Sequence, residues 1–105
     1  MACLVYVTVP GREHAVNMAR ALVESRLAAG VNVLPGARSV YRWRDEVREA
    51  EECLLFAQVS RAAFADFCRL ARQLHCHETP CIIALPIQDA YGPFARWIGK
   101  NSLPE

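Results

Sequence analysis

The sequence predicts an α+β fold in which one antiparallel sheet is covered on one face by two helices, and three observations predict it. Residues 3–9 and 81–86 are short apolar runs with β-branched side chains, as in buried strands. Residues 12–29 and 61–74 repeat apolar side chains every three or four positions, as helices do. Strand-forming residues lie on both sides of a charged centre in the segment 31–59, which favours a hairpin.

The first strand and the first helix are separated by a turn signal. Residues 3–9 end at Pro10-Gly11, a pair that favours a turn. The helical period of residues 12–29 is carried by Val16, Ala19, Leu22, Val23 and Leu27. Gly30 suits the position just past a helix end, so we expect the helix to extend to residue 29.

The segment 31–59 is expected to form a long hairpin between the second and third strands. Pro35-Gly36 interrupts its first arm, where the strand should bulge, bend or lie at an edge. Arg44-Asp45 is the expected tip. The second arm begins charged at Glu46 and becomes apolar at residues 53–57. Its tip end should therefore project into solvent or against a partner, while its far end enters the core.

The last part of the chain is expected to add a helix, a strand and a short C-terminal helix. Ser60 is a favourable N-cap for the helix 61–74, and Gly92-Pro93 opens the terminal helix, because proline is tolerated at a first helical position. The resulting order β-α-β-β-α-β is that of the ferredoxin-like, split βαβ arrangement. Its usual strand order is 4-1-3-2, which makes the first and fourth strands antiparallel neighbours.

Composition limits the class of protein. A length of 105 residues suits one domain, residues 1–105, and 53% apolar with 22% charged residues is a globular composition. A net charge of +1 lacks the basic excess typical of nucleic-acid binding, so no nucleic-acid partner is expected. The start has no basic leader, and no segment approaches about 18 consecutive apolar residues, so neither a signal peptide nor a membrane partner is expected.

Cysteine usage and missing motifs add two expectations. The five cysteines include no CxxC pair, which predicts reduced thiols and a cytoplasmic location. The sequence has no GxGxxG, P-loop, GxSxG or HExxH motif. The protein is therefore not expected to be an enzyme.

Several segments together carry a family resemblance. They are Thr8-Val9-Pro10, residues 26–36, residues 39–43, residues 75–87 and residues 94–98, with Glu49 and Glu52 at matching spacing. In this order the chain resembles the CutA divalent-ion tolerance proteins. The resemblance implies a homotrimer of ferredoxin-like subunits whose long hairpins pair across subunits. It also implies a role in tolerance of copper and other divalent ions.

The densest set of metal-ligand residue types is His75, Cys76, His77 and Cys81. Imidazole and thiolate suit copper or zinc, so we expect Cu(I) or Zn(II) to bind through His75, His77 and Cys81, with Cys76 as a substitute ligand. Copper or another divalent ion is the only cofactor implied. In extended backbone the two histidines would point to opposite faces. The alternative is a structural loop in which His75 caps the preceding helix and Cys81 packs in the core.

Aromatic and acidic residues of the hairpin form a second candidate site. Tyr41 and Trp43 alternate along one strand and share a face. With Trp97 they are expected to line an inter-subunit cleft, or to pack against a neighbouring subunit or the terminal helix. Glu49 and Glu52 are assigned to the same region. Their spacing of three points them to opposite faces unless a bulge intervenes. The alternative for these carboxylates is a solvated hairpin stem paired with arginines.

Two other functions compete with metal tolerance. One is a trimer that binds a small ligand or signals through clefts between subunits, by fold-level analogy with nitrogen-regulatory proteins. The other is an RNA-recognition module, which would need an Arg/Lys-Gly-Phe-type motif with exposed aromatics on its sheet. The strand segments carry no such motif. We therefore rank metal tolerance first and RNA recognition last.

Overall fold

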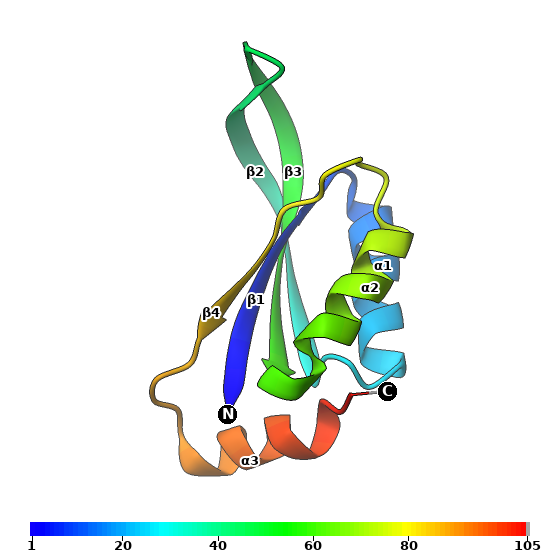
Figure 1. Ribbon diagram of the computed structural model, residues 1–105. Coiled ribbons are helices and arrows are strands. Elements are labelled where there is room, and N and C mark those ends of the chain that lie inside the picture. Colours follow the sequence, from blue (N-terminus) through cyan, green and yellow to red (C-terminus); the bar gives the residue numbers. More distant parts are fainter. Residues whose placement is uncertain (105) are drawn as a thin grey trace.

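The computed structural model describes residues 1–104 and has a four-stranded antiparallel sheet flanked by helices (Figure 1). The strands are β1 (Ala2–Val9), β2 (Gly30–Trp43), β3 (Glu46–Ser60) and β4 (Ile82–Pro86). The helices are α1 (Arg12–Glu24), the short 3-10 turn η1 (Arg61–Ala63), α2 (Phe64–Leu74) and α3 (Gly92–Asn101). The strand order β2-β3-β1-β4 confirms the expected α+β, ferredoxin-like topology, with β1 and β4 antiparallel neighbours.

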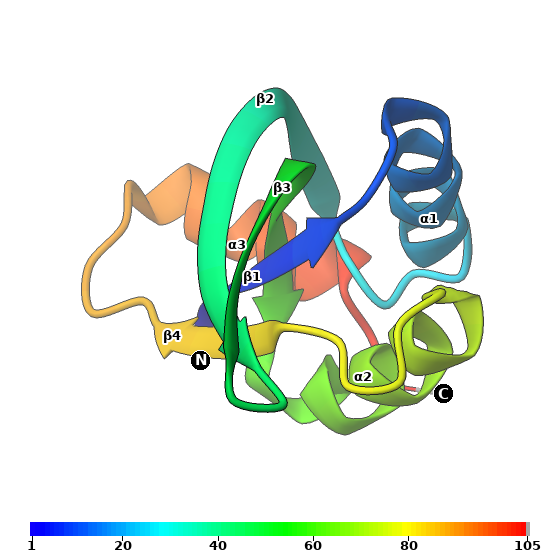
Figure 2. The same ribbon diagram turned by 90° about the horizontal axis from the view of Figure 1, so that it is seen from above.

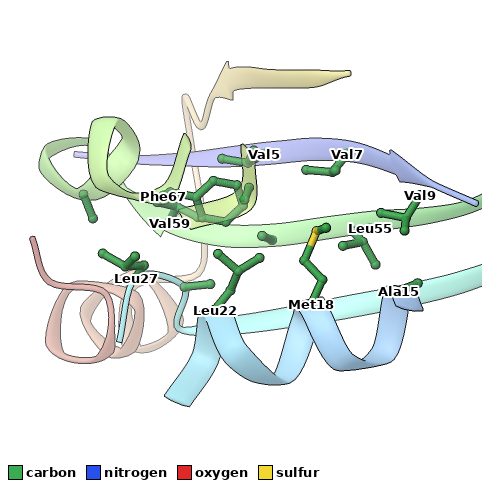
Figure 3. Close-up of a cluster of buried hydrophobic side chains, with 14 of the residues drawn as sticks. Val5, Val7, Val9, Ala15, Met18, Leu22, Leu27, Leu55, Val59 and Phe67 are labelled. Atoms are coloured by element: carbon green, nitrogen blue, oxygen red, sulfur yellow. The ribbon is translucent and has the colours of Figure 1, made fainter. Parts of the chain in front are cut away.

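The core lies between the sheet and the helices α1 and α2 (Figure 3). Alternate residues of β1, namely Val5, Val7 and Val9, are fully buried on the helix side. Met18 of α1 and Phe67 of α2 pack into the same cluster. Full burial of a side chain of this size contributes about 1.5–3 kcal/mol, so this layer holds the sheet and both helices together.

The hairpin β2-β3 extends well beyond the rest of the sheet (Figure 1). The register shifts between Leu34 and Ala37, and Gly36 has a φ of 87°, which glycine adopts without steric cost. The predicted irregularity at Pro35-Gly36 is thus confirmed as a bulge. Arg44 and Asp45, both with positive φ, form the predicted two-residue tip, as in the turns that fit hairpin twist.

The end of α1 differs from the prediction. The helix ends at Glu24, five residues early, and Arg26 adopts a left-handed φ of 64°. The amide of Leu27 donates to the carbonyl of Leu22 at 3.1 Å, and the Leu27 side chain is fully buried from this turn. Leu27 therefore continues the apolar period without belonging to the helix. Gly30 begins β2 rather than ending α1.

The start of α2 also differs from the prediction. Ser60 makes no side-chain capping hydrogen bond, and η1 precedes the α-helix. The Ser60 hydroxyl instead donates to the carbonyl of Ser102 at 2.7 Å. The Ser60 hydroxyl therefore binds a distant carbonyl group instead of capping the helix.

The second face of the sheet is covered by neither α1 nor α2. Strand alternation places Tyr6, Phe56, Ile83 and Leu85 on this outer face, and the Tyr6 and Phe56 ring centroids lie 5.5 Å apart. Ile83 and Leu85 keep about half of their surface exposed. Within residues 1–104, no helix is long and apolar enough to cross a membrane.

Candidate functional site at the hairpin tip and the loop 75–81

The loop 75–81 connects α2 to β4 and passes beside the hairpin at the top of the sheet (Figure 2). An ion pair joins the two segments, since Nη2 of Arg44 lies 3.7 Å from Oε2 of Glu78. Arg44 also lies over the ring of Trp43, at 5.6 Å from its centroid. The side chains of Arg44 and Glu78 are both largely exposed, so this ion pair contributes little to stability.

His75 ties the end of α2 to the first strand. Its backbone N–H donates to the carbonyl of Ala71 at 2.9 Å, and its ring Nε2 lies 2.8 Å from the carbonyl oxygen of Thr8. Nδ1 accepts the backbone N–H of His77 at 3.0 Å. These contacts require the tautomer with hydrogen on Nε2, and they engage both ring nitrogens. His75 thus stands at the C-cap of α2, as the structural alternative expected.

All three histidines of the chain lie together at this end of the molecule. The ring of His75 is 5.1 Å from that of His77 and 6.3 Å from that of His14. His14 is half-buried, and its Nε2 lies 2.6 Å from the carbonyl oxygen of Leu74. In this topology α1 and α2 run antiparallel, so the start of α1 meets the end of α2. That topological signal could have placed His14 here.

The electrostatics of the cluster keep His75 neutral. Burial lowers the pKa of His75 below its ordinary value, and the nearby His77 and His14 lower that pKa further. The Thr8 carbonyl and Glu52 act in the opposite direction, but burial is the largest cause. A neutral ring is the form that the Nδ1 acceptor contact requires.

The structure does not gather the expected metal ligands around one point. Within residues 1–104, no group of three or more His, Cys, Asp and Glu side chains is arranged to hold a metal ion. His77 and Cys76 are exposed, and both ring nitrogens of His75 are engaged. Cys81 precedes β4, and alternation with Ile83 places it on the outer face.

The surroundings of Cys81 agree with that placement. Burial raises the pKa of Tyr6, an outer-face residue, and Cys81 and Glu52 raise it further through charge repulsion. Cys81 is thus close enough to Tyr6 to act on its pKa. Metal binding by His75, Cys76, His77 and Cys81 therefore stays a prediction. In this conformation, a single chain does not bring these four side chains together around one point.

A cleft of about 380 Å³ separates the hairpin tip from the loop. The hairpin contributes Tyr41, Trp43, Arg44 and Arg48, and the loop contributes residues 76–79. Tyr41 and Trp43 lie opposite Arg48 and Glu46 in the ladder, which puts both aromatic rings on one face. The cleft combines aromatic surface with two guanidinium groups, a set that suits a planar anion.

The remaining candidate residues lie apart. Glu49 is exposed and accepts a hydrogen bond from Nε of Arg38 at 3.2 Å. Glu52 is buried, with 8% of its surface exposed, and lies next to the bulge opposite Ala37. Trp97 packs against Gly30 at the opposite end of β2 from the tip, so Trp97 does not reach the cleft of its own chain.

Comparison with protein families decides the relationship that the sequence suggested. Residues 3–101 match the family model described as CutA1 divalent ion tolerance protein. The chain belongs to the CutA1 family. A curated relative from Thermus thermophilus, named divalent-cation tolerance protein CutA, is 41% identical over 99 residues, which cover 94% of this chain and 96% of that protein. The mouse relative, Protein CutA, is 33% identical, and the match spans only 52% of its length.

Solved CutA1 structures share the fold described above. The divalent cation tolerance protein CutA1 from Thermus thermophilus superposes with a TM-score of 0.95 at 41% identity, covering 97% of this chain and 99% of that one. CutA1 from Oryza sativa gives a TM-score of 0.95 at 30% identity, covering 99% and 95%. The long hairpin and the terminal helix therefore belong to the CutA1 fold itself.

Proposed function

We propose that this CutA1-family chain acts as a homotrimer in tolerance of divalent cations, copper among them. The whole of residues 1–105 is taken as one CutA-like domain. The observation that carries the proposal is the uncovered outer face of the sheet, which continues into the projecting hairpin. Names of relatives such as the Thermus thermophilus protein supply the link to divalent cations.

The outer face has the properties of an interface. Leu34, Ile83 and Leu85 expose about half of their surface there, and Tyr41 exposes 41% on the same face of the hairpin. Contiguous apolar surface of this kind is costly on a monomer. Strands β2 and β4 are also open edges that need a partner or protection. Neighbouring copies that pack on these elements would bury the apolar surface and pair or cover the open strand edges.

Metal binding is proposed at the loop 75–81. His77 and Cys76 present exposed imidazole and thiol groups, which are borderline and soft ligands suited to Zn(II) or Cu(I). Two ligands do not make a stable site, so the remaining donors come from His75 and Cys81 after the loop has turned, or from a neighbouring copy. In this proposal the ion is the cargo of the trimer and not a resident cofactor.

Assembly is tested by light scattering over a dilution series. The wild-type chain should scatter with about three times the mass of one chain, since the proposal is a homotrimer. A double variant Ile83→Lys/Leu85→Lys on the outer face should dissociate, because it buries charge in the proposed interface. Val16→Lys, on the exposed surface of α1, is the matched control and should stay trimeric. A wild-type monomer at micromolar concentration contradicts the proposal.

The cleft at the hairpin tip favours a second candidate function. Arg44, Arg48, Tyr41 and Trp43 there suit a small planar anion, as in a ligand-binding or signalling trimer of the nitrogen-regulatory kind. Metabolite anions that bind with equal affinity before and after metal removal would favour this function. Anion binding that requires the metal would favour the first.

We also propose that the protein is cytoplasmic, is not an enzyme, and has neither a nucleic-acid nor a membrane partner. All five cysteines are free, which suits a reducing compartment. The net charge of +1 lacks the electrostatic footprint of a nucleic-acid-binding protein. An RNA-binding assay at low salt, with a basic protein as positive control, would contradict the proposal if it gave saturable binding.

A further inference from the structure

A groove of about 510 Å³ lies between β4 and the segment η1-α2, on the helix side of the sheet. Its floor is formed by Cys3 of β1 with Ala84 and Pro86 of β4, and Cys3 pairs directly with Pro86 in the ladder. Its wall is formed by Arg61, Ala62, Phe64 and Ala65. The groove is separate from the loop 75–81 and from the outer face, because Ala84 and Pro86 point to the helix side.

Three of the residues that line the groove are alanines, which leave space between α2 and β4. Ala62 and Ala65 on one side and Ala84 on the other place only methyl groups where α2 approaches the edge strand. Phe67, in contrast, fills the space over β1 and β3 and is fully buried. The helices thus cover the centre of the sheet and leave β4 with an apolar trough. Its volume lies within the range of small-molecule sites.

One cation stands at the rim of this apolar trough. Arg61 is exposed, and within residues 1–104 no ion pair involves it. Asp66, the next acidic residue along the chain, is hydrogen-bonded to Arg69 at 2.7 Å. Arg61 is therefore available to bind an anion with its planar, multiply donating guanidinium.

The floor of the trough does not repel an anion. Cys3 is buried, with 4% of its surface exposed, and its thiol lies 3.5 Å from the carbonyl oxygen of Val59 as a donor. Burial raises the pKa of Cys3 above its ordinary value, although Arg61 acts in the opposite direction. The thiol is consequently neutral at neutral pH.

We infer that this groove between β4 and α2 binds an amphipathic monoanion, a carboxylate with an apolar body. The apolar body lies along Phe64, Ala65 and Ala84, and the carboxylate meets the Arg61 guanidinium at the rim. An uncharged molecule of the same shape gains only the apolar contact. The site therefore selects for a molecule that combines negative charge with apolar surface.

The test uses decanoate as the probe and 1-decanol as its uncharged match, both below concentrations that form micelles. The full chain is labelled at its alanine methyl groups and titrated by NMR. Saturable shifts are expected at Ala62, Ala65 and Ala84. Decanoate should bind about tenfold tighter than decanol at low salt, since a charge-assisted contact adds to the apolar one. Added salt should reduce that difference.

Two variants distinguish binding at this groove from non-specific hydrophobic binding. Arg61→Gln should remove the preference for decanoate, while Arg72→Gln, an exposed arginine farther along α2, should retain it. The inference is overturned if the shifts fall on Ala95 of α3 or Ala50 of the hairpin instead. It is also overturned if decanol binds as tightly as decanoate, or if the two variants behave alike.

Discussion

Ser60 donates two hydrogen bonds to Ser102, which lies 42 positions further along the chain. The backbone N–H of Ser60 donates to Oγ of Ser102, and the Ser60 hydroxyl donates to the Ser102 carbonyl, each at 2.7 Å. The Ser102 hydroxyl then donates to the carbonyl of Leu27, also at 2.7 Å. One hydroxyl, 1% exposed, therefore ties the end of β3 and the turn after α1 to the C-terminal segment.

Ser102→Ala should lower the free energy of unfolding by about 1–3 kcal/mol, because it leaves the Ser60 N–H and the Leu27 carbonyl without their partner in a buried place. Urea denaturation followed by circular dichroism measures the change. Ser39→Ala is the control, because Ser39 is a half-buried residue of β2. This variant should change the free energy of unfolding by less than about 0.5 kcal/mol. Equal midpoints for both variants would show that the Ser102 contacts contribute nothing.

Trp43→Ala should reduce assembly or melting temperature more than it alters metal binding. Trp43 is half-buried in a single chain and lies on the outer-face side of the hairpin, where a neighbouring copy is proposed to pack. Truncating a well-buried aromatic costs about 3–5 kcal/mol. Scattering mass and thermal unfolding measure the effect. Tyr91→Ala, at a side chain 79% exposed, is the control, and a Trp43→Ala protein that matches it contradicts the prediction.

The sequence was informative about the fold where a local residue determines the backbone. Pro35 lacks an amide donor, Gly36 tolerates a left-handed φ, and both predicted the bulge that the ladder contains. The end of α1 was missed because Leu27 continues the apolar period from a turn rather than from the helix. Periodicity reports which side chains face the core, and it does not report the backbone that carries them.

The candidate site was harder to predict because contacts between distant segments define it. Residues His75, His77 and Cys81 are close in sequence, yet Cys81 interacts with Tyr6 while His75 binds the carbonyl of Thr8. His14 lies close to His75 because α1 packs against α2. Spacing along the chain alone contains neither relationship.

Stability should fall as the pH drops through the titration of His75. Burial lowers the pKa of His75 in the folded chain, so the unfolded chain, with an ordinary value near 6.5, binds more protons over this range. The free energy of unfolding should be level above about pH 7.5 and should decrease as the pH falls below about 6.5. Protonation also removes the Nδ1 acceptor of the His77 amide. Urea titrations with a chelator present measure this slope without metal.

His75→Gln should flatten that slope, whatever its effect on stability at neutral pH. His77→Gln is the matched variant, because it keeps the backbone amide that His75 accepts and should keep most of the slope. Groups that face His75 are His14, His77 and Glu52, and the first two lower its pKa while Glu52 raises it. An identical slope in wild type and His75→Gln would show that other groups carry the pH dependence.

Metal affinity should depend on the loop 75–81 if the ion binds there. A competition titration of Cu(I) and of Zn(II) against a chelator of known affinity compares wild type with His75→Ala/His77→Ala/Cys81→Ser. Even the loss of a group that only orients a ligand costs about 10–100-fold in affinity, so removing ligands should cost at least that much. Binding should also weaken below about pH 6, since imidazole must lose its proton to bind a metal.

The exposed groups offer a sharper version of the same experiment. His77 and Cys76 need no rearrangement to reach an ion, whereas His75 must give up its contacts with Thr8 and His77. Cys76→Ser/His77→Ala should therefore cause most of the loss in affinity. His14→Gln is the control, because its Nε2 already lies 2.6 Å from the Leu74 carbonyl oxygen, and it should bind as wild type does. Equal affinity in wild type and the triple variant would make the loop a structural connection, with His75 acting as the C-cap of α2 and any metal bound elsewhere.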